Sequence, residues 1–485
     1  MSATLKGAKH LRARFAAGMC CLSLVGCVQG PDYVKPAVEV PTAYRFGDQS
    51  FGTAQQPAWW NAYRDQNVDE LVREALENNR DLRIATARVD EFAAILAGTR
   101  SQARPQVGYG LSGNRSRASE QKIPDLVDPL STTFSTLLSA SWEIDLWGRI
   151  RRETEAARAN LLATEEARRG VTLTLISSVI SSYVTLLDLD AQLRVALATA
   201  EGRRQSVELF ETRLAAGWVS EFEMSQVRAE YESALQQLPG IEQAIATQEH
   251  ALSVLVGRNP GPIARSGEPD PRYTPIVPAG IPSELLLRRP DILQAEQQLI
   301  ASNALIGAAR ALFFPRISLT GLLGLASGSL GDLFSGSART WSFTGDVVGP
   351  IYTGGGLTAA VDQAEARRDQ SLANYEIVIQ NAFRDVEDSL ADVRNSAELR
   401  ETLMRRVATL RRGVELANLR YENGYSDYLE VLDTERSLFN AELQLASARG
   451  DYQRALVSLY RALGGDWTSV PPRPASSAQS GATKQ

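Results

Sequence analysis

Long stretches of this chain carry apolar residues at helical spacing, separated by charged and polar residues. The first stretch, from about residue 67 to residue 104, predicts one amphipathic helix that ends at Pro105. Two longer stretches run from about residue 149 to 214 and from about residue 357 to 420. At 1.5 Å per residue, a helix of roughly 65 residues reaches about 100 Å, which is too long for the core of an ordinary globular domain.

Between these helices, apolar and polar residues alternate, which predicts one pair of strands in residues 105–147 and a second pair in residues 315–352. The aromatic residues Trp142 and Trp341 belong to these strands. Strands of roughly ten residues with one apolar and one polar face are typical of a membrane barrel, with lipid outside and water inside. A soluble, half-buried hairpin has the same period and stays an alternative.

Four strands are too few to close a membrane barrel, because the smallest known bacterial barrels have about eight. The backbone at an open sheet edge also lacks the hydrogen-bond partners that it needs in lipid. A membrane barrel therefore requires several chains to pool their strands. Two chains would supply about eight strands and three chains about twelve.

The two halves of the chain repeat the same plan. Residues 79–82 correspond to 289–292, residues 213–217 to 420–424, and residues 256–257 to 463–464. The spacing between the copies stays near 210 residues, far longer than the repeat of a solenoid protein. The sequence therefore predicts the duplication of a whole half-protein.

Residues 170–187 hold no charged side chain, so they could form a transmembrane helix. They also contain several Ser and Thr residues, and their large residues follow the spacing of a coiled-coil seam: Leu173, Ile176, Ile180, Tyr183 and Leu187. This spacing favours helix packing over a membrane span.

The N-terminus has the pattern of a secretory signal, with four basic residues before an apolar run that is too short to span a bilayer. Residues 24–27 (LVGC) resemble the bacterial lipobox, which implies cleavage after Gly26 and a covalent lipid on Cys27. Several acyl chains on one residue would anchor the chain stably in a membrane. Secretory cleavage without lipid is the alternative. Removal of residues 1–26 would change the formal net charge from −6 to −10.

Composition excludes several classes of function. After cleavage, Cys27 and His250 are the remaining cysteine and histidine, so neither a disulfide framework nor a Cys/His metal site can form. The acidic chain has no basic patch of the kind that nucleic acid requires. Residues 354–356 (GGG) lack the following Lys and Ser or Thr of a phosphate loop. We therefore expect no catalytic site, no metal and no cofactor other than the lipid on Cys27.

Several motifs together resemble the TolC-like outer-membrane factor family, specifically its lipoprotein branch of NodT-type efflux components. The most specific stretches are residues 281–292 (IPSELLLRRPDI), 306–311 (IGAARA) followed by Phe314 and Pro315, and 349–356 (GPIYTGGG). The resemblance covers residues 30–467, which is nearly all of the chain that would remain after cleavage.

The resemblance implies a mainly α-helical protein with membrane β-strands. Its expected form is a homotrimer in which a twelve-stranded outer-membrane β-barrel continues into a long periplasmic α-helical coiled-coil barrel. The implied partners are a periplasmic adaptor (membrane fusion protein), an inner-membrane efflux transporter and the lipid of the outer membrane. The implied location is the outer membrane of a Gram-negative bacterium, where the chain would be lipid-anchored and extend into the periplasm.

Each half has a turn at the far end of its long helix, at residues 213–222 and 420–429. Gly217 and Gly424 suit the left-handed residue that ends many helices, and a plain antiparallel hairpin would explain them equally well. In the family these turns contact the adaptor. The resemblance therefore assigns adaptor contact to Arg213, Gly217, Ser220, Arg420, Gly424 and Asp427.

Just beyond the second turn, Leu429 and Asp433 are four residues apart and share one helix face, with Glu430 beside them. They match positions where members of the family close the tunnel with an apolar ring and an acidic ring. In a trimer the carboxylates would repel one another and attract cations, so a closed tip should respond to pH. A solvated helix face is the alternative, and the first repeat has Phe222 and Gln226 at the corresponding positions.

The leading functional hypothesis is a passive exit duct of a tripartite efflux system, for small molecules such as drugs or toxic compounds, driven by an inner-membrane pump through an adaptor. The duct of a protein-secretion system and a non-conducting, lipid-anchored structural coiled coil are the alternatives. The predicted organisation is a signal peptide (1–26), a lipid anchor with an extended tether (27–66), a first repeat (67–257), a Pro-rich connector (258–285), a second repeat (286–467) and a disordered tail (468–485).

Overall fold

The computed structural model describes residues 28–46, 60, 65–119, 129–265 and 282–465. The predicted signal peptide, Cys27, most of the predicted connector and the predicted tail lie outside the described residues.

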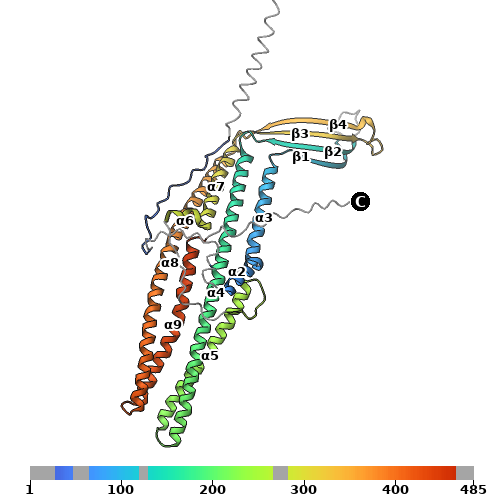
Figure 1. The fold of residues 1–485 in the computed structure, drawn as a ribbon. Coiled ribbons are helices and arrows are strands. Elements are labelled where there is room, and N and C mark those ends of the chain that lie inside the picture. The colour runs from blue at the N-terminus through green and yellow to red at the C-terminus, as the bar shows by residue number, and fades with distance from the viewer. Residues whose placement is uncertain (1–27, 47–59, 61–64, 120–128, 266–281, 466–485) are drawn as a thin grey trace, which may run out of the picture. The chain divides into compact units, whose positions relative to one another are not determined.

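The two repeats contain corresponding helices and strands in the same order (Figure 1). The first repeat contains α2 (Gln66–Asn78), α3 (Arg80–Ser101), β1 (Gln106–Arg117), β2 (Leu130–Ile144), α4 (Arg149–Ala215) and α5 (Glu221–Leu255). The second contains α6 (Pro282–Arg288), α7 (Pro290–Ala311), β3 (Arg316–Ser327), the short 3₁₀ helix η4 (Gly336–Ala338), β4 (Arg339–Val348), α8 (Gly356–Glu422) and α9 (Tyr428–Ala462). Helices α4 and α8 have 67 residues each. Both begin and end within two residues of the predicted long helices.

The prediction of one continuous helix over residues 67–104 was wrong, because the structure breaks it at Asn79 into α2 and α3. The Asn79 side chain accepts a hydrogen bond from the backbone N–H of Leu82 at 2.9 Å and so caps the new helix. Its amide also donates to the backbone oxygen of Leu255 at 2.9 Å. The second repeat has the same break at Arg289, and its first helix begins at Pro282, four residues before the predicted start.

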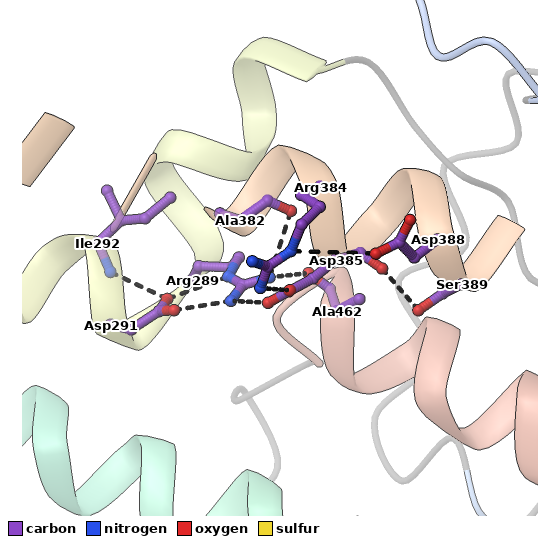
Figure 2. A network of polar contacts seen from close by, with 9 residues as sticks. All are labelled: Arg289, Asp291, Ile292, Ala382, Arg384, Asp385, Asp388, Ser389 and Ala462. Atoms are coloured by element: carbon purple, nitrogen blue, oxygen red, sulfur yellow. Dashed lines mark hydrogen bonds and ion pairs between the residues drawn. The ribbon is translucent and has the colours of Figure 1, made fainter. Parts of the chain in front are cut away.

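Arg289 makes the corresponding contact in the second repeat, with more partners (Figure 2). Its guanidinium donates to the backbone oxygens of Ala462 at 3.0 Å and Ala382 at 3.4 Å. It also forms ion pairs with Asp291 at 2.7 Å and Asp385 at 3.1 Å. The buried Arg289 therefore joins the break between α6 and α7 to the end of α9 and the middle of α8.

The four strands form one antiparallel sheet in the order β1-β2-β3-β4, so β1 and β4 are its edges within the chain. The register aligns an apolar row across one face, Tyr109, Leu138, Leu323 and Trp341, and all four side chains are exposed. A polar row crosses the other face: Gln106, Ser141, Thr320 and Thr344. One face of the sheet is thus apolar without being covered by this chain.

The chain folds into two compact units, and each draws on both repeats. One unit contains the described parts of residues 28–37, 88–165 and 294–376, which include the sheet. The other contains the described parts of residues 38–87, 166–293 and 377–465, which include α2, α5, α6 and α9. The duplicated halves therefore do not fold as separate domains.

Among the described helices, α4 has an apolar stretch that is long enough to cross a membrane, and 61% of that stretch is buried inside the protein. Ile176, Ile180 and Tyr183 from this stretch form one core cluster with apolar residues of α2, α5 and α9. The seam predicted over residues 170–187 thus packs against other helices.

Candidate functional site

The two helical hairpins, α4 with α5 and α8 with α9, end in turns of the same construction. Gly217 has a φ of 74° and Gly424 a φ of 72°, a conformation that favours glycine. The following residues, Trp218 and Tyr425, donate their N–H groups to the backbone oxygens of Arg213 at 2.9 Å and Arg420 at 2.8 Å. These bonds close a Schellman motif at the end of each long helix.

The returning helices are capped by predicted tip residues. Ser220 caps α5 and forms a capping box with Glu223, and these hydrogen bonds lower the pKa of the Glu223 carboxyl. Asp427 caps α9 by accepting from the N–H of Glu430 at 3.3 Å. The structure therefore assigns turn-forming roles to Gly217, Gly424, Ser220 and Asp427.

The two predicted tip arginines have different surroundings. Arg213 donates to the Tyr421 hydroxyl at 3.0 Å, and its guanidinium lies 5.6 Å from the Phe210 ring centre. Both aromatic rings contact Tyr428, whose burial raises its pKa to about 12. Arg213 thus joins the first hairpin to the second. The exposed Arg420 pairs with Glu430 at 3.2 Å instead.

The three predicted gate residues lie on the exposed side of α9. Leu429 is 53% exposed and Asp433 is also exposed, whereas Val431 and Leu432 are buried in the cluster that joins the hairpins. Glu430 is exposed but bound to Arg420. An apolar side chain and a carboxylate therefore face away from the chain's own core.

A polar cluster joins α4, α5 and α9 within the same compact unit as the turns. Arg203 and Glu230 form an ion pair at 3.2 Å, and their side chains are only 6% and 12% exposed. Glu230 also pairs with Arg436, while the Arg203 guanidinium lies 5.3 Å from the centre of the Phe439 ring. A buried ion pair with additional partners thus holds the first hairpin against the second.

This cluster was not among the predicted site residues. The one available signal is that Arg203 lies seven residues before Phe210 on α4, a coiled-coil spacing at which a charged residue needs a partner. The corresponding position of the second repeat holds Leu410. Glu230 lies 27 positions from Arg203, and Arg436 lies 206 positions from Glu230. Helical spacing could not identify partners at such separations.

Glu435 adds a pH-dependent element to this cluster. Burial raises the pKa of Glu435 above its ordinary value of 4.5, against the opposing effect of Arg203 and with a contribution from Glu230. The folded protein therefore binds more protons than the unfolded chain, and its free energy of unfolding falls as the pH rises above about 4.5.

We expect Glu435→Gln to reduce this fall, as measured by chemical unfolding at pH 4 and pH 7. An unchanged difference between the two pH values would contradict the prediction.

The described residues 28–36 lie along the unit that contains the sheet. The Gln29 N–H donates to the backbone oxygen of Trp147 at 3.1 Å, and the buried Arg152 pairs with Asp32 at 2.8 Å. Gly30 touches Gly307 of α7 so closely that a Cβ on Gly30 would lie 2.3 Å from the Gly307 Cα. The segment next to the predicted lipid site is therefore fixed against α4 and α7.

The described ranges contain no group of three His, Cys, Asp or Glu side chains placed to hold a metal ion. His250 lies exposed on α5.

A family model described as outer membrane efflux protein matches residues 71–258 and 281–465. The chain belongs to the outer membrane efflux protein family. The matched residues include the hairpins and the sheet. This is a family of outer membrane efflux channels and not of enzymes.

Among its relatives is the cation efflux system protein CusC of Escherichia coli, which is 38% identical over 451 residues, 92% of this chain and 97% of CusC. The toluene efflux pump outer membrane protein TtgI of Pseudomonas putida is 37% identical over 456 residues, 92% of this chain and 97% of TtgI. The open state of the Neisseria gonorrhoeae MtrE outer membrane channel has a TM-score of 0.82 at 30% identity and covers 91% of this chain and 98% of MtrE. This outer membrane efflux protein thus shares nearly the whole chain with relatives from three genera.

Proposed function

We propose that three copies of this efflux protein form one passive exit duct, in which twelve pooled strands span the outer membrane and the long helices form a periplasmic tunnel. The observation that carries this proposal is the sheet. It presents an exposed apolar row on one face, a polar row on the other, and unpaired edges at β1 and β4 within the chain. Edge pairing between copies would close the sheet and place the apolar row in lipid.

The duct takes its energy from an inner-membrane efflux transporter and receives solutes through a periplasmic adaptor. The exposed parts of the two turns are the surface for this adaptor. Trp218 and Tyr425 are 80% and 78% exposed at corresponding positions of the two hairpins, and Arg420 is exposed beside them. Arg213 supports this surface indirectly, because its guanidinium is bound to Tyr421. Small toxic molecules are the proposed cargo, in line with relatives named for cation and toluene efflux.

A covalent lipid on Cys27 anchors the chain to the outer membrane. We expect Cys27→Ala to abolish labelling by radioactive palmitate, since the thiol is the attachment point of the lipid. Cys20→Ala and Cys21→Ala are matched controls, because both residues belong to the predicted signal peptide and their loss should leave the labelling of the mature protein unchanged. Labelling that persists in Cys27→Ala would overturn the assignment.

The closed end of the duct lies at Leu429 and Asp433, with Glu430 held to one side by Arg420. Threefold symmetry would bring three Asp433 carboxylates together, and a bound cation would stabilise them in the closed state. The exposure of Asp433 on the side of α9 that faces away from the hairpin core supports this arrangement.

Single-channel recording in planar bilayers tests the duct and its gate together. We expect small or rare currents from the native protein and openings that are at least about tenfold more frequent from Asp433→Ala, because a charge-assisted contact contributes roughly 1.5–3 kcal/mol. Glu422→Ala is the matched control, because it removes an exposed carboxylate beside the same turn but outside the predicted gate. Absence of current from correctly assembled native and Asp433→Ala oligomers would favour the non-conducting structural coiled coil.

A further inference from the structure

A pocket of about 360 Å³ lies between α4, α7, α8 and the start of β3, inside the compact unit that contains the sheet. One part of its wall is apolar and consists of Leu305, Leu312 and four alanines from α7 and α8. The remainder of the wall carries three guanidinium groups, from Arg149, Arg316 and Arg367.

Two of these three arginines have no acidic partner among the described residues. Arg149 is neutralised by Glu143 and Glu153, each at 2.9 Å. Across the part of the chain that the structure describes, no ion pair or hydrogen bond engages the side chain of Arg316 or Arg367. Glu153 is the acidic residue of the pocket wall, so the wall carries excess positive charge.

The pocket lies on the polar side of the sheet. Arg316 alternates with Ile317 along β3, and Ser318, on the same face as Arg316, is paired with Glu143 of β2. On α7, Leu305 lies on the side opposite Gly307, which contacts the N-terminal segment, and Leu312 follows directly after the end of the helix. The pocket and the segment that follows the lipid site therefore contact different sides of α7.

We propose that this pocket binds organic anions that carry an apolar group, such as aryl or alkyl phosphates, sulfonates and carboxylates. The two unpaired guanidinium groups bind the anionic head, and the wall of leucines and alanines covers the apolar part. Its role as a binding site for solutes during export rests on the proposed duct, in which the polar face of the sheet lines the water-filled path. The acidic gate would then attract cationic solutes, whereas this basic pocket would attract anionic ones.

Equilibrium dialysis of the full-length protein in an uncharged detergent, with 1-naphthyl phosphate as the probe, tests the proposal. We expect saturable binding that Arg316→Gln/Arg367→Gln weakens at least about tenfold, because two charge-assisted contacts are lost. Arg115→Gln/Arg339→Gln is the matched control, since it removes the same charge from exposed arginines at the opposite end of the sheet. Inorganic phosphate and 1-naphthol should each bind more weakly than the probe, because each lacks one of the two required groups.

Equal affinity of the native protein and the Arg316→Gln/Arg367→Gln variant would overturn the proposal, as would equal binding of inorganic phosphate and the probe. Helical circular dichroism and oligomer size should match in all variants, so that lost binding does not reflect misfolding.

The anion could be a membrane phospholipid or an exported solute. Phosphatidylglycerol that copurifies with the native protein but not with Arg316→Gln/Arg367→Gln would assign a lipid, whereas equal lipid content with probe binding would assign a solute. Conductance of the native protein tests the duct separately, and its absence would leave the binding result unaffected.

Discussion

Replacing Glu230 with alanine is expected to lower the free energy of unfolding by about 3–5 kcal/mol, because it leaves the buried Arg203 charge without its partner. The same change releases Arg436 of α9, so the first hairpin also loses an attachment to the second. The effect can be measured as the shift of the guanidinium-induced unfolding transition of the purified protein, followed by helical circular dichroism.

Glu211→Ala is the control for this experiment. Glu211 pairs with Arg228 across the same hairpin at 2.9 Å, but both side chains are more than half exposed. Exposed ion pairs contribute about 0–1 kcal/mol, so this variant should unfold almost like the native protein. Similar shifts in the two variants would show that the Arg203–Glu230 pair has no special role in joining the hairpins.

Replacing Arg289 with alanine is expected to cost about 3 kcal/mol. The loss removes the side-chain donor to the backbone oxygens of Ala382 and Ala462 and the partner that Asp291 and Asp385 share (Figure 2). The two carboxylates are partly exposed and can be hydrated, so the expected cost lies at the lower end of the range for buried ion pairs. Chemical unfolding of the variant measures it.

Arg384→Ala is the control, because it also removes a positive charge beside Asp385 but leaves the contacts of Arg289 in place. Arg384 pairs with the same carboxylate at 2.9 Å, but its side chain is 63% exposed. We expect a change below about 1 kcal/mol for this control. An Arg289→Ala variant as stable as Arg384→Ala would mean that the contacts of Arg289 with the backbone oxygens contribute little.

The sequence predicts the long helices and the strand pairs well because their signals are local and repeated. The coiled-coil spacing continues through α4 and α8 without a glycine-rich or proline interruption near their middle, and alternation marks β2 and β3. The break at Asn79 was missed because an asparagine inside an amphipathic pattern is a weak signal. Its counterpart in the second repeat is followed by Pro290, so a comparison of the repeats could have located it.

The candidate site was predictable in position but not in its contacts. Gly217 and Gly424 mark the turns because each adopts a positive φ. The spacing of Leu429 and Asp433 likewise places them on one face of α9. Nothing local, however, reveals that Arg213 binds Tyr421 or that Arg203 binds Glu230, because these contacts form between segments that meet only in the folded hairpins.

Asn79 and Arg289 occupy the same place in the duplicated plan, and each donates to the backbone at the end of its own returning helix. One half does so with a neutral amide and the other with a guanidinium paired to Asp385, where the first half has Ser178. The descendants of one ancestral half have therefore become chemically unequal. A chain built from two copies of the first half would keep both backbone contacts and the carboxylate of Asp81, the counterpart of Asp291, but it would lose the charges of Arg289 and Asp385. The two halves are therefore no longer interchangeable.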